Sequence, residues 1–271
     1  MRFLPLYLCA LWASSAVAHE YWIEPQDFAP PADGMLVADL VNGEEFEGTR
    51  LPYLPARTVS YVVAHDGRLQ PVEARIGDRP ALNMQSLGDG LHVVAFQSGW
   101  SQVTYDEFAA FLRFAGHKDL IGGAEAVEAA HRARGLPEDR FTEAYARYSK
   151  SLIGAGSGEG ADRRLGLETE LVALDNPYTD DLSDGLRVRL YYAGEVRARE
   201  QVEILARAPD GSVAVSTVRT DSRGVAVIPV LPGHDYMLDA VVLREPGAER
   251  VARFDAVWET LWANLTFSVP D

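Results

Sequence analysis

Cysteine is almost absent from this chain. Its 271 residues include a single cysteine, Cys9, which lies close to the N-terminus. A mature protein that begins after Ala18 would contain neither a thiol nor a disulfide, which excludes a cysteine nucleophile and a thiolate metal site. Cys9 follows Tyr7-Leu8 rather than the small residues that precede a lipid-modified cysteine, so we do not expect a lipid anchor. The stability of the mature chain must therefore come from an ordinary hydrophobic core.

Basic residues are also few. The chain has 25 Lys and Arg against 40 Asp and Glu, a formal net charge of −15. Nucleic acids and anionic membrane surfaces are bound through clustered Lys and Arg, so we expect no nucleic-acid partner. The acidic balance is compatible with cation binding, but it is more often only a feature of a highly soluble protein.

Long hydrophobic runs are missing beyond the first residues. No later segment approaches the roughly 20 apolar residues that a membrane-spanning helix needs, so we expect a protein that is not membrane-embedded. The early apolar run, residues 3–12, follows Arg2 and precedes an A-x-A sequence at 16–18. This order is typical of a secretory signal peptide. We predict cleavage after Ala18, export to the periplasm, and a mature protein whose first residue is His19.

The remaining sequence predicts a mainly β protein with a helical insert. Residues 19–103 contain short β-prone runs separated by turn pairs such as Asn42-Gly43, which predicts an N-terminal β domain. Residues 104–160 are predicted to be a helical segment and linker. Residues 161–271 alternate apolar and polar residues and include a hairpin signal at Asp210-Gly211. They predict a C-terminal β-sandwich of the immunoglobulin-like or prealbumin-like kind.

The middle region has helical periodicity. A capping-box pattern starts at Thr104, and apolar residues recur from Phe108 with the spacing of one helix face. A second helix is predicted over 124–134, and an apolar stripe over 141–152 predicts a third. The glycine-rich residues 154–160 lack the Lys-Ser/Thr ending of a phosphate loop, so we interpret them as a flexible linker.

Metal binding is the chemistry that the residues support best. As the first residue, His19 would offer an α-amine and an imidazole, and neutral nitrogen ligands suit nickel, cobalt, copper and zinc. The other five histidines are His65, His92, His117, His131 and His234. None of them forms a tight metal-binding motif with His19, so further ligands must come from distant segments. We predict a metal site at His19, His92 and His117.

Each candidate also has a structural interpretation. His92 shares a strand face with Val94 and Phe96, which favours a core or edge position whose hydrogen bonds are satisfied within the protein. His117 follows Gly116 at a predicted helix end, where it could instead interact with the helix dipole. His131, on the second predicted helix, is expected at the surface. Catalytic motifs are missing: no serine lies in a G-x-S-x-G sequence, so we do not expect a hydrolase.

Several short segments occur in one order along the mature chain. They are 19–25 (HEYWIEP), 43–48 (GEEFEG), 147–150 (RYSK), 165–168 (LGLE) and 220–224 (TDSRG). Together they resemble the bacterial domain-of-unknown-function 4198 family. That family is often grouped with periplasmic components of nickel and cobalt uptake, so the resemblance implies metal transport, with a membrane metal transporter as a partner. The last segment resembles a turn of prealbumin-like domains, which implies fold rather than chemistry.

The sequence therefore predicts a secreted, periplasmic, non-enzymatic protein that binds a divalent transition-metal ion as an accessory or carrier. The alternative is a metal-free β-sandwich module that binds a protein or carbohydrate partner. For that module, Trp258 and Trp262 could stack on sugar rings, although we expect both side chains mainly in the core. A third hypothesis is a copper enzyme that uses His19 as a histidine brace.

Overall fold

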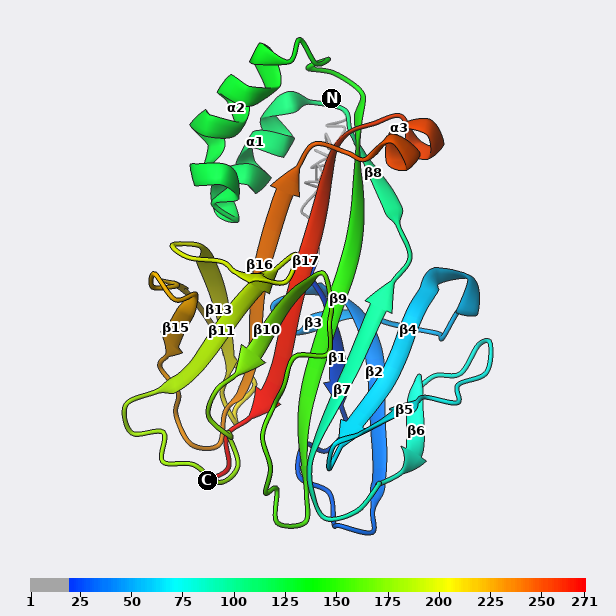
Figure 1. Cartoon of the computed structure of the whole chain (residues 1–271), viewed down its shortest axis with the longest axis vertical. Helices are drawn as coiled ribbons and strands as arrows, with labels where there is room; N and C mark the ends of the chain where they lie inside the picture. The colour runs from blue at the N-terminus through cyan, green and yellow to red at the C-terminus, as the bar shows by residue number, and fades with distance from the viewer. Residues whose placement is uncertain (1–19) are drawn as a thin grey trace, which may run out of the picture.

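The computed structural model describes residues 20–271 and contains three β-sheets. One sheet has nine strands and runs along the length of the molecule (Figure 1), and we call it the central sheet. In order across the central sheet, the strands are β14 (Val213–Arg219), β13 (Gln201–Arg207), β16 (Asp235–Arg244), β17 (Ala256–Ser268), β9 (Phe141–Ala155), β7 (Gly90–Ser98), β4 (Thr58–His65) and β5 (Arg68–Pro71), with β8 (Ser101–Tyr105) also paired to β9. β17 and β9 are parallel, and the other pairs in this sheet are antiparallel.

Two four-stranded sheets complete the β structure. The first small sheet comprises β1 (Glu20–Pro25), β2 (Met35–Glu44), β3 (Glu47–Leu51) and β6 (Leu82–Gln85). The second small sheet comprises β10 (Thr169–Ala173), β11 (Leu186–Tyr192), β12 (Glu195–Val196) and β15 (Val225–Ile228). The prediction of a mainly β protein with a helical insert is confirmed.

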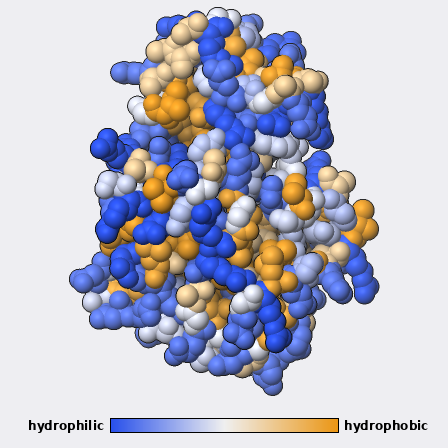
Figure 2. Space-filling model, in the orientation of Figure 1, coloured by the Kyte–Doolittle hydropathy of each residue, from blue (hydrophilic) through white to orange (hydrophobic). Residues whose placement is uncertain are grey.

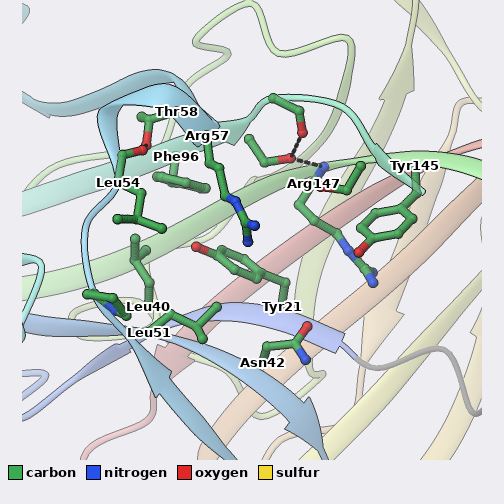
Figure 3. Close-up of a pocket in the computed structure, with 14 residues that line it drawn as sticks. Tyr21, Leu40, Asn42, Leu51, Leu54, Arg57, Thr58, Phe96, Tyr145 and Arg147 are labelled. Atoms are coloured by element: carbon green, nitrogen blue, oxygen red, sulfur yellow. Dashed lines mark hydrogen bonds between the residues drawn. The ribbon is translucent and has the colours of Figure 1, made fainter. Parts of the chain in front are cut away.

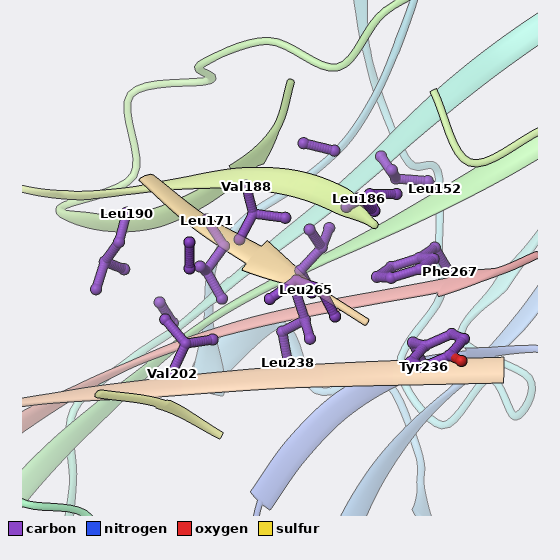
Figure 4. Close-up of a cluster of buried hydrophobic side chains, with 14 of the residues drawn as sticks. Leu152, Leu171, Leu186, Val188, Leu190, Val202, Tyr236, Leu238, Leu265 and Phe267 are labelled. Atoms are coloured by element: carbon purple, nitrogen blue, oxygen red, sulfur yellow. The ribbon is translucent and has the colours of Figure 1, made fainter. Parts of the chain in front are cut away.

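The small sheets cover opposite faces of the central sheet. Leu152 of β9 belongs to a buried cluster with Leu171 and Val188 of the second small sheet (Figure 4). Ile153, the next residue, packs in a different cluster with Ile23 and Leu36 of the first small sheet. Because successive side chains of a strand point to opposite faces, the molecule has three layers with the central sheet in the middle.

This arrangement corrects the prediction of a helix over 141–152. Those residues form most of β9, a 15-residue strand in which the last ten residues are all buried. A strand covered on both faces loses the apolar–polar alternation by which a strand is recognised in a sequence, so an apolar stripe can mimic a helix face. The predicted segment 104–160 is therefore two helices and a long strand, and the boundary drawn at 103 falls inside β8.

The predicted linker over 154–160 is also corrected, because Gly154 belongs to β9. A Cβ atom at Gly154 would lie 2.7 Å from Cγ of Tyr178, so glycine lets this ring pack directly on the strand. Asn176 fixes the following turn through hydrogen bonds to the carbonyl oxygens of Gly158 and Gly160. The glycines therefore serve close packing and tight turning here rather than flexibility.

The helices lie together at one end of the central sheet (Figure 1). They are α1 (Phe108–His117), α2 (Ala124–Ala133) and α3 (Ala248–Phe254), and the 3-10 turn η2 (Leu120–Gly122) joins α1 to α2. A second 3-10 turn, η1 (Pro55–Arg57), directly precedes β4. The first two α-helices confirm the prediction, but α1 starts after Glu107 without a side-chain cap, and Thr104 belongs to β8. The ring of Phe114 stacks on that of Trp262, with centroids 5.4 Å apart, which ties α1 to β17. Trp258 and Trp262 are both buried, as expected.

On the face drawn in Figure 2, hydrophobic residues form separate small patches among hydrophilic ones, and none of these patches dominates this face. Scattered apolar side chains of this kind are normal on folded proteins. From residue 20 to residue 271, no helix has the length and apolar character needed to cross a membrane.

Candidate functional site

A buried lysine gathers three carboxylates near the start of β1. Lys118 follows α1 directly and is only 6% exposed. Its Nζ donates to Glu20 Oε1 and to Asp239 Oδ2, each at 3.0 Å, and also to Glu203 Oε2. We call Lys118, Glu20, Glu203 and Asp239 the Lys118 cluster. It joins the helical end of the molecule to the first small sheet and to the central sheet.

The strand register explains why a cation is needed at this position. Glu203 of β13 and Asp239 of β16 are directly paired across the central sheet, and both are buried. Two like charges directly opposite each other destabilise a sheet. The turn after α1 places the ammonium group of Lys118 between them, and the carboxylate of Glu20 adds a third negative charge. Despite its burial, which favours the neutral amine, the pKa of Lys118 is raised by these three carboxylates.

His117 adds an imidazole to the edge of this cluster. Its Nε2 lies 2.7 Å from Glu203 Oε1, while 58% of the side chain remains exposed. The hydrogen bond to Glu203 raises the pKa of His117. Burial by itself would raise the pKa of Glu203, but the hydrogen bond from His117 and the charge of Lys118 lower it to about 2. Glu203 thus stays ionised and divides its two oxygens between His117 and Lys118.

Asp239 is the least satisfied member of the Lys118 cluster. Its Oδ2 accepts from Lys118, but its buried Oδ1 has no hydrogen-bond partner. Burial raises the pKa of Asp239 to about 6, against the opposing charge of Lys118. This carboxyl group therefore changes its protonation state near pH 6, whereas Glu203 stays ionised there.

Of the three predicted ligands, His19 lies outside the described residues. It is joined by a peptide bond to Glu20, whose carboxylate belongs to the Lys118 cluster. His117 contacts Glu203 of the same cluster. The fold therefore places His117 near Glu20, the residue that follows His19. Glu20 and Lys118, the neighbour of His117, are 98 positions apart in the sequence.

His92 is placed elsewhere. It is fully buried near the start of β7, at the end of the central sheet away from α1 (Figure 1). Its Nε2 accepts from the backbone N–H of Leu87 at 3.1 Å, and its Nδ1 donates to the carbonyl oxygen of Gly90 at 3.0 Å. Burial and the stacked ring of His65 lower the pKa of His92 to about 4. With both nitrogens engaged, His92 is a structural histidine in this arrangement, and the structure does not bring it to His117.

The prediction that His131 lies on the surface is wrong. Its side chain is fully buried between α2 and the central sheet. Its Nδ1 accepts from Trp258 Nε1 at 3.0 Å, and its Nε2 donates to the carbonyl oxygen of Pro137. Across residues 20–271, no group of three or more His, Cys, Asp or Glu side chains is placed to hold a metal ion.

Sequence reasoning missed Lys118, Glu203 and Asp239. A signal was available, because Glu203 and Asp239 interrupt the apolar residues of β13 and β16, within the region 161–271 that was predicted to be a β-sandwich. A charged residue inside a buried strand needs a partner of opposite charge. The chain has only two lysines, Lys118 and Lys150, and both lie buried among carboxylates. The pairing itself could not be read from the sequence, since the partners are far apart along the chain.

The similarity to known families covers most of the chain. Residues 16–244 match the family described as Domain of unknown function (DUF4198). The chain belongs to this family. The matched range includes His117 and every residue of the Lys118 cluster. The resemblance inferred from the short sequence segments is thus confirmed.

Other comparisons add little to this DUF4198 protein. No curated protein matches it. One solved structure with some similarity is entitled "Crystal structure of tetra-tandem repeat in extending region of large adhesion protein", at 12% identity and a TM-score of 0.21. The alignment covers 93% of this chain and 50% of that one, so the DUF4198 protein spans about half its length. A TM-score this low supports no conclusion about fold or function.

Proposed function

We propose that this DUF4198 protein is a periplasmic, non-enzymatic carrier or accessory protein for a divalent transition-metal ion. Nickel, cobalt, copper and zinc are the candidate ions, because imidazole and amine nitrogens bind all four. The observation that supports the proposal best is the contact between His117 and Glu203 beside Glu20, the residue that follows His19. The ion would be passed to a membrane metal transporter.

The proposed ligands are the α-amine and imidazole of His19 and the imidazole of His117, with Glu203 Oε1 beside them. His117 Nε2 and Glu203 Oε1 lie 2.7 Å apart and are joined by one proton. A metal ion that binds the neutral imidazole would replace this proton. Lys118 is a positioning residue here, since it holds Glu20 and Glu203 in place through hydrogen bonds. His92 is not part of the revised set, because its two ring nitrogens are already engaged.

Metal titration by calorimetry tests the proposal. The protein that starts at His19 is compared with a form that carries one additional N-terminal glycine and with the variant His117→Ala. We expect each change to weaken binding by about tenfold or more, as is typical when a metal site loses a ligand or its support. His234→Ala is the matched control, because it removes a histidine whose ring contacts its own turn at Pro232.

The same titration also tests the alternative function, a metal-free interaction module. If the protein that starts at His19 binds none of the four ions more tightly than an unrelated acidic protein does, the metal proposal is wrong. The metal-free interaction module then replaces it. Binding that survives both the added glycine and His117→Ala would instead place the ion away from the Lys118 cluster.

A further inference from the structure

A pocket of about 290 Å³ lies between the first small sheet and the central sheet. Its wall is built by β1, β2 and β3 on one side and by β4, β7, β8 and β9 on the other, with η1 at its rim. Figure 3 shows the side chains that these elements contribute to its lining. The volume lies near the lower limit of small-molecule sites in proteins, so the pocket suits a ligand of metabolite size.

The charge of this pocket is opposite to that of the whole protein. The chain carries 40 acidic residues, yet none of the lining residues is Asp or Glu. Two of the lining residues are arginines, Arg57 and Arg147. Within the part of the chain that the structure describes, neither guanidinium forms a salt bridge. An anion would therefore find two positive charges here and no competing carboxylate in the wall.

Arg147 is a buried cation with free donors. It is 6% exposed, and its Nε and Nη1 atoms have no hydrogen-bond partner. The guanidinium lies over the ring of Trp262, with Cζ 3.9 Å from the ring centroid, and over the ring of Tyr145 at 4.9 Å. Nearby carboxylates interact with it electrostatically, but none accepts a hydrogen bond from it. Buried charged donors are normally satisfied, which points to an acceptor supplied from outside the chain.

The rest of the wall is apolar and aromatic. Tyr21 and Phe96 stack with centroids 5.4 Å apart, and Leu40, Leu51 and Leu54 continue the same surface. In Figure 3 the side chain of Arg57 extends from η1 toward Tyr21. The arrangement offers a surface for a hydrocarbon or an aromatic ring next to the two guanidinium groups.

We propose that this pocket binds a small organic carboxylate with an apolar or aromatic body. The carboxylate is held by Arg147 and Arg57, since guanidinium donors match the geometry of carboxylate oxygens. The body packs on the leucines and on the stacked rings of Tyr21 and Phe96. The proposal does not depend on metal binding, because it uses neither His19 nor His117.

Calorimetric titration with phenylacetate, its neutral amide phenylacetamide and inorganic phosphate tests the proposal. We expect phenylacetate to bind and phenylacetamide to bind about tenfold more weakly, since the amide loses the charge that pairs with the arginines. Phosphate should bind more weakly than phenylacetate, because it lacks the apolar body. If the amide or phosphate binds as tightly as phenylacetate, or if phenylacetate does not bind at millimolar concentration, the proposal is wrong.

Three variants locate the binding. Arg57→Ala removes an exposed guanidinium at the rim and should weaken phenylacetate binding, and Leu51→Glu should abolish it by placing a carboxylate in the wall. Arg223→Ala is the matched control, since it removes the same charge from a turn that does not line the pocket. Equal weakening by Arg57→Ala and Arg223→Ala would overturn the proposal. Arg147→Met is measured together with its unfolding midpoint, because this variant removes a buried cation. Arg57→Ala and Leu51→Glu keep the test independent of whether Arg147→Met folds.

Discussion

Lys118 shows how burial and ion pairing compete at a single residue. Burial disfavours its ammonium form, but Asp239, Glu20 and Glu203 together raise its pKa. A buried pair gains little over an apolar replacement, whereas removing one partner leaves uncompensated charge in the interior. The charge balance at the contact between α1 and the two sheets therefore depends on this one amine.

The variant Lys118→Met should be destabilised by about 3 kcal/mol or more at pH 7, because three carboxylates lose their counter-charge. Urea denaturation followed by tryptophan fluorescence measures this loss. The difference in stability between Lys118→Met and the unmodified protein should become smaller at pH 5. Asp239, whose pKa is about 6, is protonated there and needs no counter-charge. Arg113→Met on the exposed face of α1 is the control and should stay within about 0.5 kcal/mol. A Lys118→Met protein as stable as the control would contradict the assigned role.

His117 should titrate above the ordinary histidine value of about 6.5, because its hydrogen bond to Glu203 favours the protonated ring. NMR titration of the ring proton signals measures the midpoint, and Glu203→Gln should return it toward the ordinary value. A folded pKa above the unfolded one means that this pair stabilises the protein below about pH 6.5 and loses its contribution as pH rises through the folded pKa. A midpoint at or below the ordinary value would refute the pairing.

At the scale of elements, β9 shows what the sequence pattern could not predict. Strands with one solvated face, such as β4 and β11, alternate in burial, and they lie in the regions 19–103 and 161–271 that were predicted to be β structure. β9 is covered on both faces, so its sequence lacks alternation over its last ten residues, and its pattern predicts a helix and a linker instead of a strand. The helices α1 and α2 were found because each has one apolar face and one solvated face.

Trp262 of β17 connects this strand to α1, because its ring stacks on that of Phe114 of α1. The guanidinium of Arg147 lies over the same ring in a cation–π contact. Trp262→Ala should cost about 3–5 kcal/mol through the cavity left in the core. Thermal unfolding monitored by circular dichroism measures the change. An unchanged midpoint together with lost binding of a sugar or protein partner would instead support the metal-free interaction module.

At the scale of the whole molecule, strands from both predicted β domains share the central sheet. β4, β5 and β7 come from residues 19–103, while β13, β14, β16 and β17 come from residues 161–271. We expect one cooperative unfolding transition, with equal calorimetric and van't Hoff enthalpies. Two resolved transitions would show that the regions separated at 103 and 160 are independent domains.

Export is a further prediction for the whole chain. Cleavage after Ala18 predicts that protein recovered from the periplasm starts with His-Glu-Tyr-Trp. N-terminal sequencing of that protein measures this directly. An uncleaved chain, or protein found only in the cytoplasm, would remove the basis for an N-terminal metal ligand at His19.

The sequence by itself determined the local features. Short-range sequence patterns predict turn pairs, strands with one solvated face and amphipathic helices. Segments such as 19–25 and 220–224 indicate the family. The tertiary structure alone decided which distant groups meet. It buried His131 and His92, joined Glu20 to Lys118, and placed Arg147 in a pocket wall, because burial on both sheet faces and ion pairing across layers depend on packing between segments far apart in the chain.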